Sequence, residues 1–194
     1  MTTLNVPDLS SYLAQIENMS EKELLDEIKK NITKGIEFFK SLYTDINNHS
    51  NLSSLCDILV TEGYEYAHKI DCALEIVHII TNSQTNRYVY ENCFEYMIRL
   101  PTIIGQANDV KMVSVDIEIA TSVELSQMKG ELTNVSDVER DILINAYISS
   151  VDEKKRLSVN HKINIFNNFL NQCMLQLYQV KTKLKYVNLS NNHY

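Results

Sequence analysis

The sequence predicts an all-α, single-domain helical bundle of about five to seven helices, with a long, heptad-patterned C-terminal helix. Apolar residues recur at three- and four-residue steps through most of the 194 residues, which is the period of a helix face. The chain holds only 4 Gly and 2 Pro, too few for turn-rich β architectures or glycine-loop nucleotide sites. We expect one domain over residues 1–187 and a disordered tail over residues 188–194.

Two capped helices are expected in the first part of the chain. Asp8 precedes a short amphipathic pattern, and Ser20 with Glu23 forms a capping box, in which each side chain bonds a backbone N–H at the helix start. The capping box should begin a long helix over residues 20–48. Its apolar face is expected to comprise Leu24, Leu25, Ile28, Ile32, Ile36, Phe39, Tyr43 and Ile46.

The middle of the chain contains a second long helix over residues 51–81 and a third helix after it. Gly63 interrupts the second helix and marks a kink or a close helix contact. The third helix should stop before Pro101, because proline disrupts a helix interior. Residues 102–128 fit both the period of two of a strand and a helical period; we favour helix, because a lone strand has no partner in this sequence.

The last part of the chain begins with a loop at Gly130 and a capping box of Ser136 and Glu139, so a helix should start at about Asp137. A coiled-coil-like heptad helix is then expected over residues 157–187, packed on the chain's own acidic helices or on another protein. Its seam is formed by Val159, Ile163, Phe166, Leu170, Cys173, Leu177, Val180, Leu184 and Val187.

Charge is distributed unevenly along the chain. Residues 1–151 hold 11 Lys/Arg and 23 Asp/Glu, whereas residues 152–194 hold 7 and 2. The basic segment either packs along the acidic helices or presents a surface to a protein partner, for which Lys154, Lys155, Arg156 and Lys162 are the candidate residues. Because the whole chain is acidic, with a net charge of −7, binding to DNA is not expected.

The expected compartment is the reducing cytoplasm. The N-terminus shows no secretory signal pattern, and no stretch is apolar enough for a transmembrane segment. The four cysteines lack metal or redox spacing and are expected to be reduced and packed as small apolar side chains: Cys56, Cys72, Cys93 and Cys173.

Two Glu-x-x-His motifs, Glu65 with His68 and Glu75 with His78, resemble the motif of ferritin-type di-iron bundles. That family carries the motif on two different helices, whereas here both copies share one helix about 15 Å apart. We therefore expect no metal, cofactor or catalytic residue, and these four residues are the candidates if a metal is bound.

Two short segments resemble known binding proteins. The run Leu52-Ser-Ser-Leu55-Cys56-Asp57 is similar to the core of a BH3 segment of the Bcl-2 apoptosis regulators, which implies a groove-binding helical bundle. Residues 139–147 resemble the third-helix signature of 14-3-3 proteins, but Ile148 stands where that family has a phosphate-binding lysine, so that function is not carried over.

The predicted function is that of a non-enzymatic intracellular helical interaction module or assembly subunit, which binds a protein partner through helix surfaces. A Bcl-2-like groove-binding bundle is one alternative. A metal-binding or enzymatic helical bundle is the other.

Overall fold

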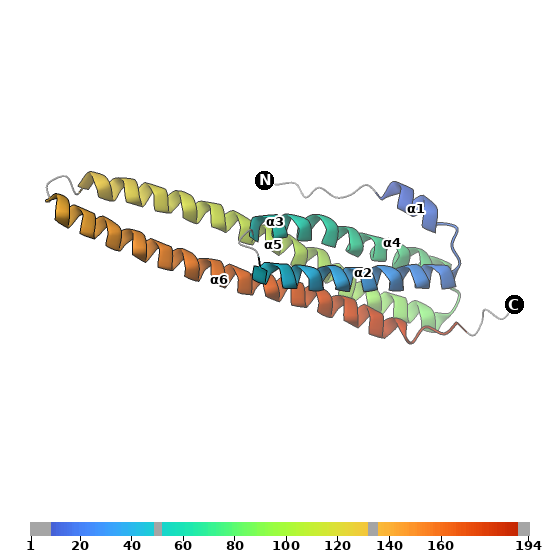
Figure 1. The fold of residues 1–194 in the computed structure, drawn as a ribbon. Coiled ribbons are helices and arrows are strands. Elements are labelled where there is room, and N and C mark those ends of the chain that lie inside the picture. The colour runs from blue at the N-terminus through green and yellow to red at the C-terminus, as the bar shows by residue number, and fades with distance from the viewer. Residues whose placement is uncertain (1–8, 49–51, 132–135, 190–194) are drawn as a thin grey trace. The chain divides into compact units, whose positions relative to one another are not determined.

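The computed structural model describes residues 9–48, 52–131 and 136–189, with side chains except at 47–48, 108–125, 128–129, 131, 151 and 154–159. Most of the described residues are helical and none of them forms a strand, so the all-α prediction is confirmed, including the helical choice for residues 102–128 (Figure 1). The elements are α1 (Ser10–Ile16), α2 (Glu21–Asn48), α3 (Leu52–Ile58), the π-helix η1 (Leu59–Gly63), α4 (Tyr64–Ile80), α5 (Gln84–Glu131) and α6 (Asp137–Leu184).

The chain divides into two compact units. Unit 1 comprises Met1–Asn108 and Asn167–Tyr194, and unit 2 comprises Asp109–Phe166. Helices α5 and α6 each contribute one part to unit 1 and the other part to unit 2. Folding of residues 1–187 as one cooperative domain stays a prediction.

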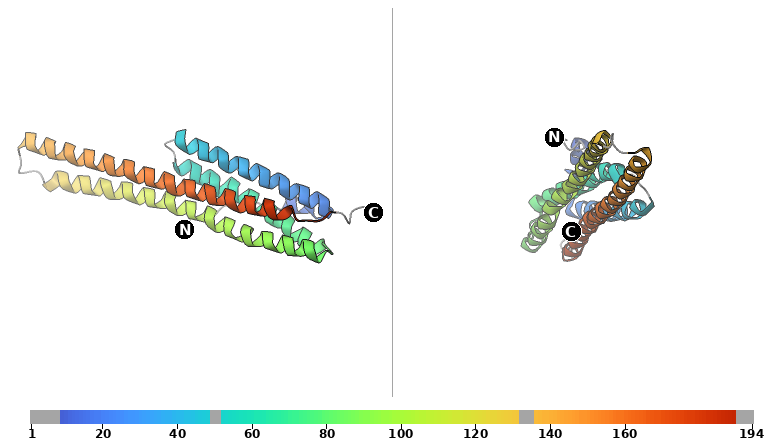
Figure 2. Two further views of the ribbon diagram at one scale, coloured as in Figure 1. Left: turned by 90° about the horizontal axis from the view of Figure 1, so that it is seen from below. Right: turned by 90° about the vertical axis from the view of Figure 1, so that its left-hand side faces the viewer.

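Unit 1 is a bundle in which α2, the α3–η1–α4 run, the start of α5 and the end of α6 surround one core (Figure 2). The apolar face predicted for α2 is confirmed except at Tyr43, which is 40% exposed, while the neighbouring Leu42 is buried. The capping box is also present: the Glu23 N–H donates to Ser20 Oγ at 3.2 Å, and the Ser20 N–H donates to Glu23 Oε2 at 3.4 Å.

Helix α1 starts later than its predicted cap. It begins at Ser10, with Leu9 at the N-cap position and no side-chain capping bond there. The predicted capping residue, Asp8, lies outside the described residues. The helix is anchored by Ile16, which is fully buried.

Gly63 lies where η1 passes close to α2. A Cβ atom at Gly63 would lie 3.2 Å from Phe39 Cε1 and 3.3 Å from Leu59 Cδ1. The predicted close helix contact is therefore confirmed, and the helix changes to π geometry over the same turn. A π turn is rare because its i to i+5 bonding adds a residue to the turn.

The prediction that a helix stops before Pro101 is wrong, because α5 continues through this residue to Glu131. Proline in a helix interior costs about 3 kcal/mol, since it lacks an N–H and its ring meets the preceding turn. Burial of the neighbouring apolar side chains in unit 1 offsets this cost: Leu100, Ile103, Ile104 and Ala107. Helix α5 also includes Gly130, where a loop was predicted.

Helix α6 starts at Asp137 as predicted, and the Glu139 N–H donates to Ser136 Oγ at 3.3 Å. The charged run at residues 152–156 does not end the helix, so the two predicted helices are one. Toward the end of α6, its buried side carries Phe166, Leu170, Cys173, Leu177, Val180 and Leu184. These are seam positions of the predicted heptad pattern; coiled-coil packing itself stays a prediction.

The end of α6 packs on the chain's own helices in unit 1. Leu177 Cδ1 lies so close to α2 that a Cβ atom at Gly35 would be 3.0 Å from it. On the other side, the Cys93 thiol of α5 is 4.0 Å from the Val180 carbonyl oxygen.

Asn86 joins three segments of unit 1 through its side-chain amide. Its Nδ2 donates to Glu21 Oε1 at 2.8 Å and to the Asn188 carbonyl at 3.2 Å, and its Oδ1 accepts the Asn188 N–H at 3.0 Å. Asn188, where the disordered tail was predicted to begin, is thus held by side-chain bonds. Residues 190–194 lie outside the described residues.

Across the described ranges, no helix combines the length and apolarity that crossing a membrane requires.

Candidate functional site

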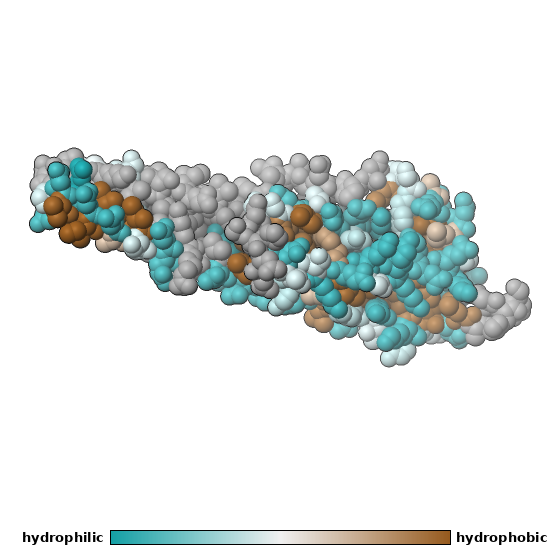
Figure 3. Space-filling view, viewed as in Figure 1, coloured by the Kyte–Doolittle hydropathy of each residue, from teal (hydrophilic) through white to brown (hydrophobic). Residues whose placement is uncertain are grey.

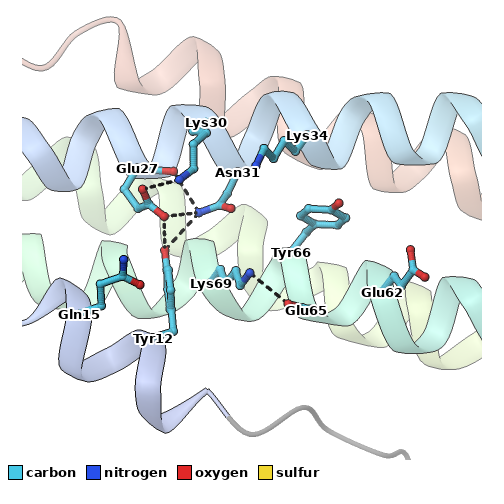
Figure 4. A pocket seen from close by; sticks show the side chains of 10 residues that line it. All are labelled: Tyr12, Gln15, Glu27, Lys30, Asn31, Lys34, Glu62, Glu65, Tyr66 and Lys69. Carbon is cyan, nitrogen blue, oxygen red and sulfur yellow. Dashed lines mark hydrogen bonds and ion pairs between the residues drawn. The ribbon is translucent and has the colours of Figure 1, made fainter.

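A polar cleft of about 410 Å³ lies in unit 1 between α1, α2 and α4, beside the π turn (Figure 4). Helix α1 closes one end of it with Tyr12 and Gln15. The long walls are formed by α2 on one side and by η1 and α4 on the other. The wall residues are Glu27, Lys30, Asn31, Lys34, Glu62, Glu65, Tyr66 and Lys69.

A hydrogen-bond network fixes the α1 end of the cleft. The Tyr12 hydroxyl donates to Glu27 Oε1 at 3.1 Å, and Asn31 Nδ2 donates to the Tyr12 hydroxyl at 3.1 Å and to the Glu27 carbonyl at 3.0 Å. Burial and the neighbouring Glu27 carboxylate raise the pKa of Tyr12. Burial opposes ionisation of Glu27, but Lys30, Tyr12 and Asn31 stabilise the carboxylate, and its pKa is lowered overall.

The charges of the cleft largely compensate one another. Lys30 pairs with Glu27 and Lys69 pairs with Glu65, both at 3.0 Å. Of the remaining charged wall residues, Lys34 and Glu62 are exposed to solvent. Three lysines and three glutamates together leave no concentrated charge of one sign for a ligand. The network therefore fastens α1 to the bundle, which is a structural role.

A smaller cleft of about 270 Å³ lies between α4 and α5, also in unit 1. Its lining residues are Tyr64, Ala67, His68, Asp71, Met97, Ile98 and Pro101. Burial raises the pKa of Asp71, while the nearby His68 acts in the opposite direction. The His68 ring contacts Tyr64, with 5.2 Å between the ring centroids.

The four metal candidates are not brought to a common site. Glu65 is paired with Lys69 and His68 contacts Tyr64. His78, at the other end of α4 from Glu65 and close to Glu75 in sequence, lies 3.8 Å from Glu91 and packs edge-on against Phe94. Among the residues that the structure describes, no three His, Cys, Asp or Glu side chains form a group that could hold a metal ion.

The predicted partner-binding cations lie on α6 within unit 2. Lys162 is only 9% exposed, so most of its side chain is not available to a partner. The side chains of Lys154, Lys155 and Arg156 lie outside the described part, and their role stays a prediction.

The BH3-like segment forms α3, where Leu55 and Cys56 are buried in unit 1. A BH3 helix binds by inserting its apolar side chains into a groove of another protein. In this chain those two side chains are already packed in the core of unit 1.

The cysteines behave as apolar core residues. All four lie in the described part of the chain, none forms a disulfide, and three of them are buried. Burial raises the pKa of Cys93 and of Cys173 to about 12. A thiol with so high a pKa is almost entirely protonated near neutral pH and is a poor nucleophile.

Unit 2 exposes apolar side chains at the start of α6, where brown residues gather in Figure 3. Val138 is 71% exposed, Ile142 is 62%, Leu143 is 44% and Ile148 is 40%. From Ser136 to Ser150 every residue is exposed or half-buried. Within the described residues of unit 2, α5 and α6 run side by side as a two-helix hairpin, and α5 is the helix of this unit that α6 can pack against (Figures 1 and 2).

The exposed pair Val138 and Ile142 defines the outer face of α6. A helix turns by about 100° per residue. This rotation places the pair opposite Arg140, Ile144 and Tyr147, the half-buried residues of the same stretch. The predicted partner-binding residues did not include this face, because they were chosen by charge. The signal was present: apolar residues occur on both sides of the helix.

Comparison with family models, with curated proteins and with solved structures finds no match to this chain.

Proposed function

We propose that this chain is a non-enzymatic helical interaction module, acting in a reducing intracellular compartment, that binds a protein partner through the outer face of α6 in unit 2. The exposure of Val138 and Ile142, at 71% and 62%, carries the proposal. Two large apolar side chains one turn apart on the solvent side of a helix form the anchor pattern by which helices bind partners. A partner that covers them would remove apolar surface from water, and each Å² buried in this way contributes about 25 cal/mol to the free energy of binding.

The rest of the molecule supports a binding role. The larger cleft has compensated charges, and the buried cysteines are unreactive core residues. The proposed surface lies on the helix α6, and helices hold side chains more precisely than loops do.

The test compares two variants of the full-length chain. Val138→Ser/Ile142→Ser removes the apolar pair, and Tyr88→Ser/Ile98→Ser removes two side chains of unit 1 that are equally exposed, at 67% and 69%. Proteins captured from a native lysate by each variant are identified, and each candidate is then purified and titrated against the wild-type chain. We expect one partner to bind directly and to be lost only with the α6 variant.

Two results would contradict the proposal. The first is a direct partner that binds both variants with the same affinity as the wild-type chain. The second is a stoichiometric content of iron, manganese or zinc in the purified chain, which would favour the metal-protein alternative.

A further inference from the structure

We infer that the element which docks on the outer face of α6 is a cationic amphipathic helix of a partner protein. This inference rests on the proposed function and adds the chemistry of the partner. It follows from the charges around Val138 and Ile142.

The apolar pair is flanked by carboxylates on both sides. At about 100° per residue, Glu139 lies on one side of the pair and Asp141 on the other, and both are exposed. Asp137 and Asp152 are also exposed on this part of α6. Within residues 136–150 the cation is Arg140, which lies on the opposite, half-buried side; the side chains of Lys154, Lys155 and Arg156, which follow Asp152, lie outside the described part.

Such a surface selects its partner by charge as well as by apolar contact. A helix with two apolar residues at i and i+4, bordered by lysine or arginine, would place the apolar pair on Val138 and Ile142 and cations near Glu139 and Asp141. A helix bordered by acidic residues would meet like charges. Like-charge contacts at an interface suppress wrong partners, and opposite charges accelerate association.

The length of the apolar contact sets the expected affinity of the partner helix for the outer face of α6. Beyond Ile142, the same side of α6 continues with Asn145 and Ser149, which are polar and exposed. The anchor therefore covers little more than one helical turn, and much of the selectivity must come from the flanking charges. We expect binding that weakens clearly as salt is added, because exposed charge pairs are screened.

The experiment uses three synthetic peptides and the full-length chain. The first is a cationic amphipathic helix with leucines at i and i+4 bordered by lysines. The second carries glutamates in place of those lysines, and the third is a scrambled peptide with the composition of the first. Binding is measured by fluorescence anisotropy at low and at physiological salt. We expect the cationic helix to bind at least about tenfold more tightly than the other two, which corresponds to about 1.4 kcal/mol.

Two variants separate the apolar and the charge contributions. Val138→Ser/Ile142→Ser should remove the preference for the cationic helix over its scrambled form. Glu139→Gln/Asp141→Asn should weaken its binding by about tenfold and reduce the salt dependence. Glutamine is as acceptable as glutamate at the third helical position of a capping box, so the start of α6 should be kept in this variant.

The matched control is Asp26→Asn/Glu37→Gln, which removes two exposed carboxylates of unit 1. It lowers the negative charge of the chain by the same amount as the α6 charge variant. Binding of the cationic helix should stay unchanged in this control, because both positions lie on α2.

The outcomes are distinguishable. Equal binding of the cationic and anionic helices, lost in Val138→Ser/Ile142→Ser, would overturn this inference and leave the proposed function standing. Equal binding of the cationic helix and its scrambled form would show general attraction to an acidic protein and overturn the inference. Absence of binding by all three peptides would overturn it as well.

Discussion

Helix α6 runs through both units but is buried to different extents in them. In unit 1 the end of α6 is covered on its seam side, and seam positions such as Leu170 and Leu177 are fully buried. In unit 2 the start of the same helix leaves Val138 and Ile142 mostly in solvent. A face of a helix is buried only where a neighbouring helix covers it. A bundle provides several neighbours, and a hairpin provides one.

The largest expected effect is on the core of unit 1. Leu170→Asp places a charge at a fully buried position and should destabilise the protein by about 4 kcal/mol or more, or unfold it. The same change in unit 2, Ile142→Asp, should cost no more than about 0.5 kcal/mol, because that position is 62% exposed. Thermal unfolding followed by circular dichroism measures both. Equal losses of stability in the two variants would contradict the difference in burial between Leu170 and Ile142.

The second expected effect is alkaline destabilisation of unit 1. In the unfolded chain Cys93 and Cys173 should lose their protons near the ordinary thiol pKa of 9.0, whereas burial raises the pKa to about 12 in the folded chain. Between these values the unfolded state binds fewer protons than the folded state. The contribution of the two protonated thiols to the free energy of unfolding is therefore complete below pH 9 and is lost as the pH rises toward 12.

Urea unfolding at a series of pH values from about 8 upward measures this loss. The variant Cys93→Ala/Cys173→Ala should show a flatter decline above the ordinary thiol pKa than the wild-type chain. A decline of the same slope in both would mean that these thiols do not contribute to it.

A moderate effect is expected at the polar junction of unit 1. Asn86→Ala removes the bonds to Glu21 and to both backbone groups of Asn188, and should cost about 1–3 kcal/mol. It should also speed amide hydrogen exchange at Asn188. The control in unit 2 is Asn145→Ala, an exposed position, where the stability should change by no more than about 0.5 kcal/mol. Unchanged exchange at Asn188 in Asn86→Ala would refute this role.

The smallest effects are expected at two glycines. Gly63→Ala should destabilise unit 1 by about 1 kcal/mol, because the new methyl group would meet Phe39 and Leu59 at 3.2 and 3.3 Å and the core must shift. Gly130→Ala in the last turn of α5 meets no atom within 4 Å and should stabilise by up to about 0.5 kcal/mol through helix propensity. Chemical denaturation measures both. Stabilisation by Gly63→Ala would show that the contact with α2 is loose.

Much of unit 1 could be predicted, because local patterns and burial agree there. The apolar face of α2, its capping box and the close contact at Gly63 follow from residue spacing, hydroxyl chemistry and the absence of a side chain. Tyr43 and Pro101 were predicted incorrectly. A tyrosine fits an apolar pattern yet tolerates water through its hydroxyl, and a proline remains in a helix when its neighbours are buried.

The candidate site was less predictable. The cationic candidates on α6 were chosen by charge alone, and the burial of Lys162 depends on packing that charge does not reveal. The outer face of α6 was not predicted as a binding surface. Nothing in the spacing of Val138 and Ile142 tells how many helices are near enough to cover them.

The apolar period of three and four residues specifies helices along the chain, and Ser20 and Ser136 mark two of their starts. Which of the apolar faces are covered depends on how the helices are arranged in space. Helix periodicity is a property of neighbouring residues along the chain, so it can be read locally. Burial depends on helices that are distant in sequence, and their number changes along α6 from the bundle of unit 1 to the hairpin of unit 2.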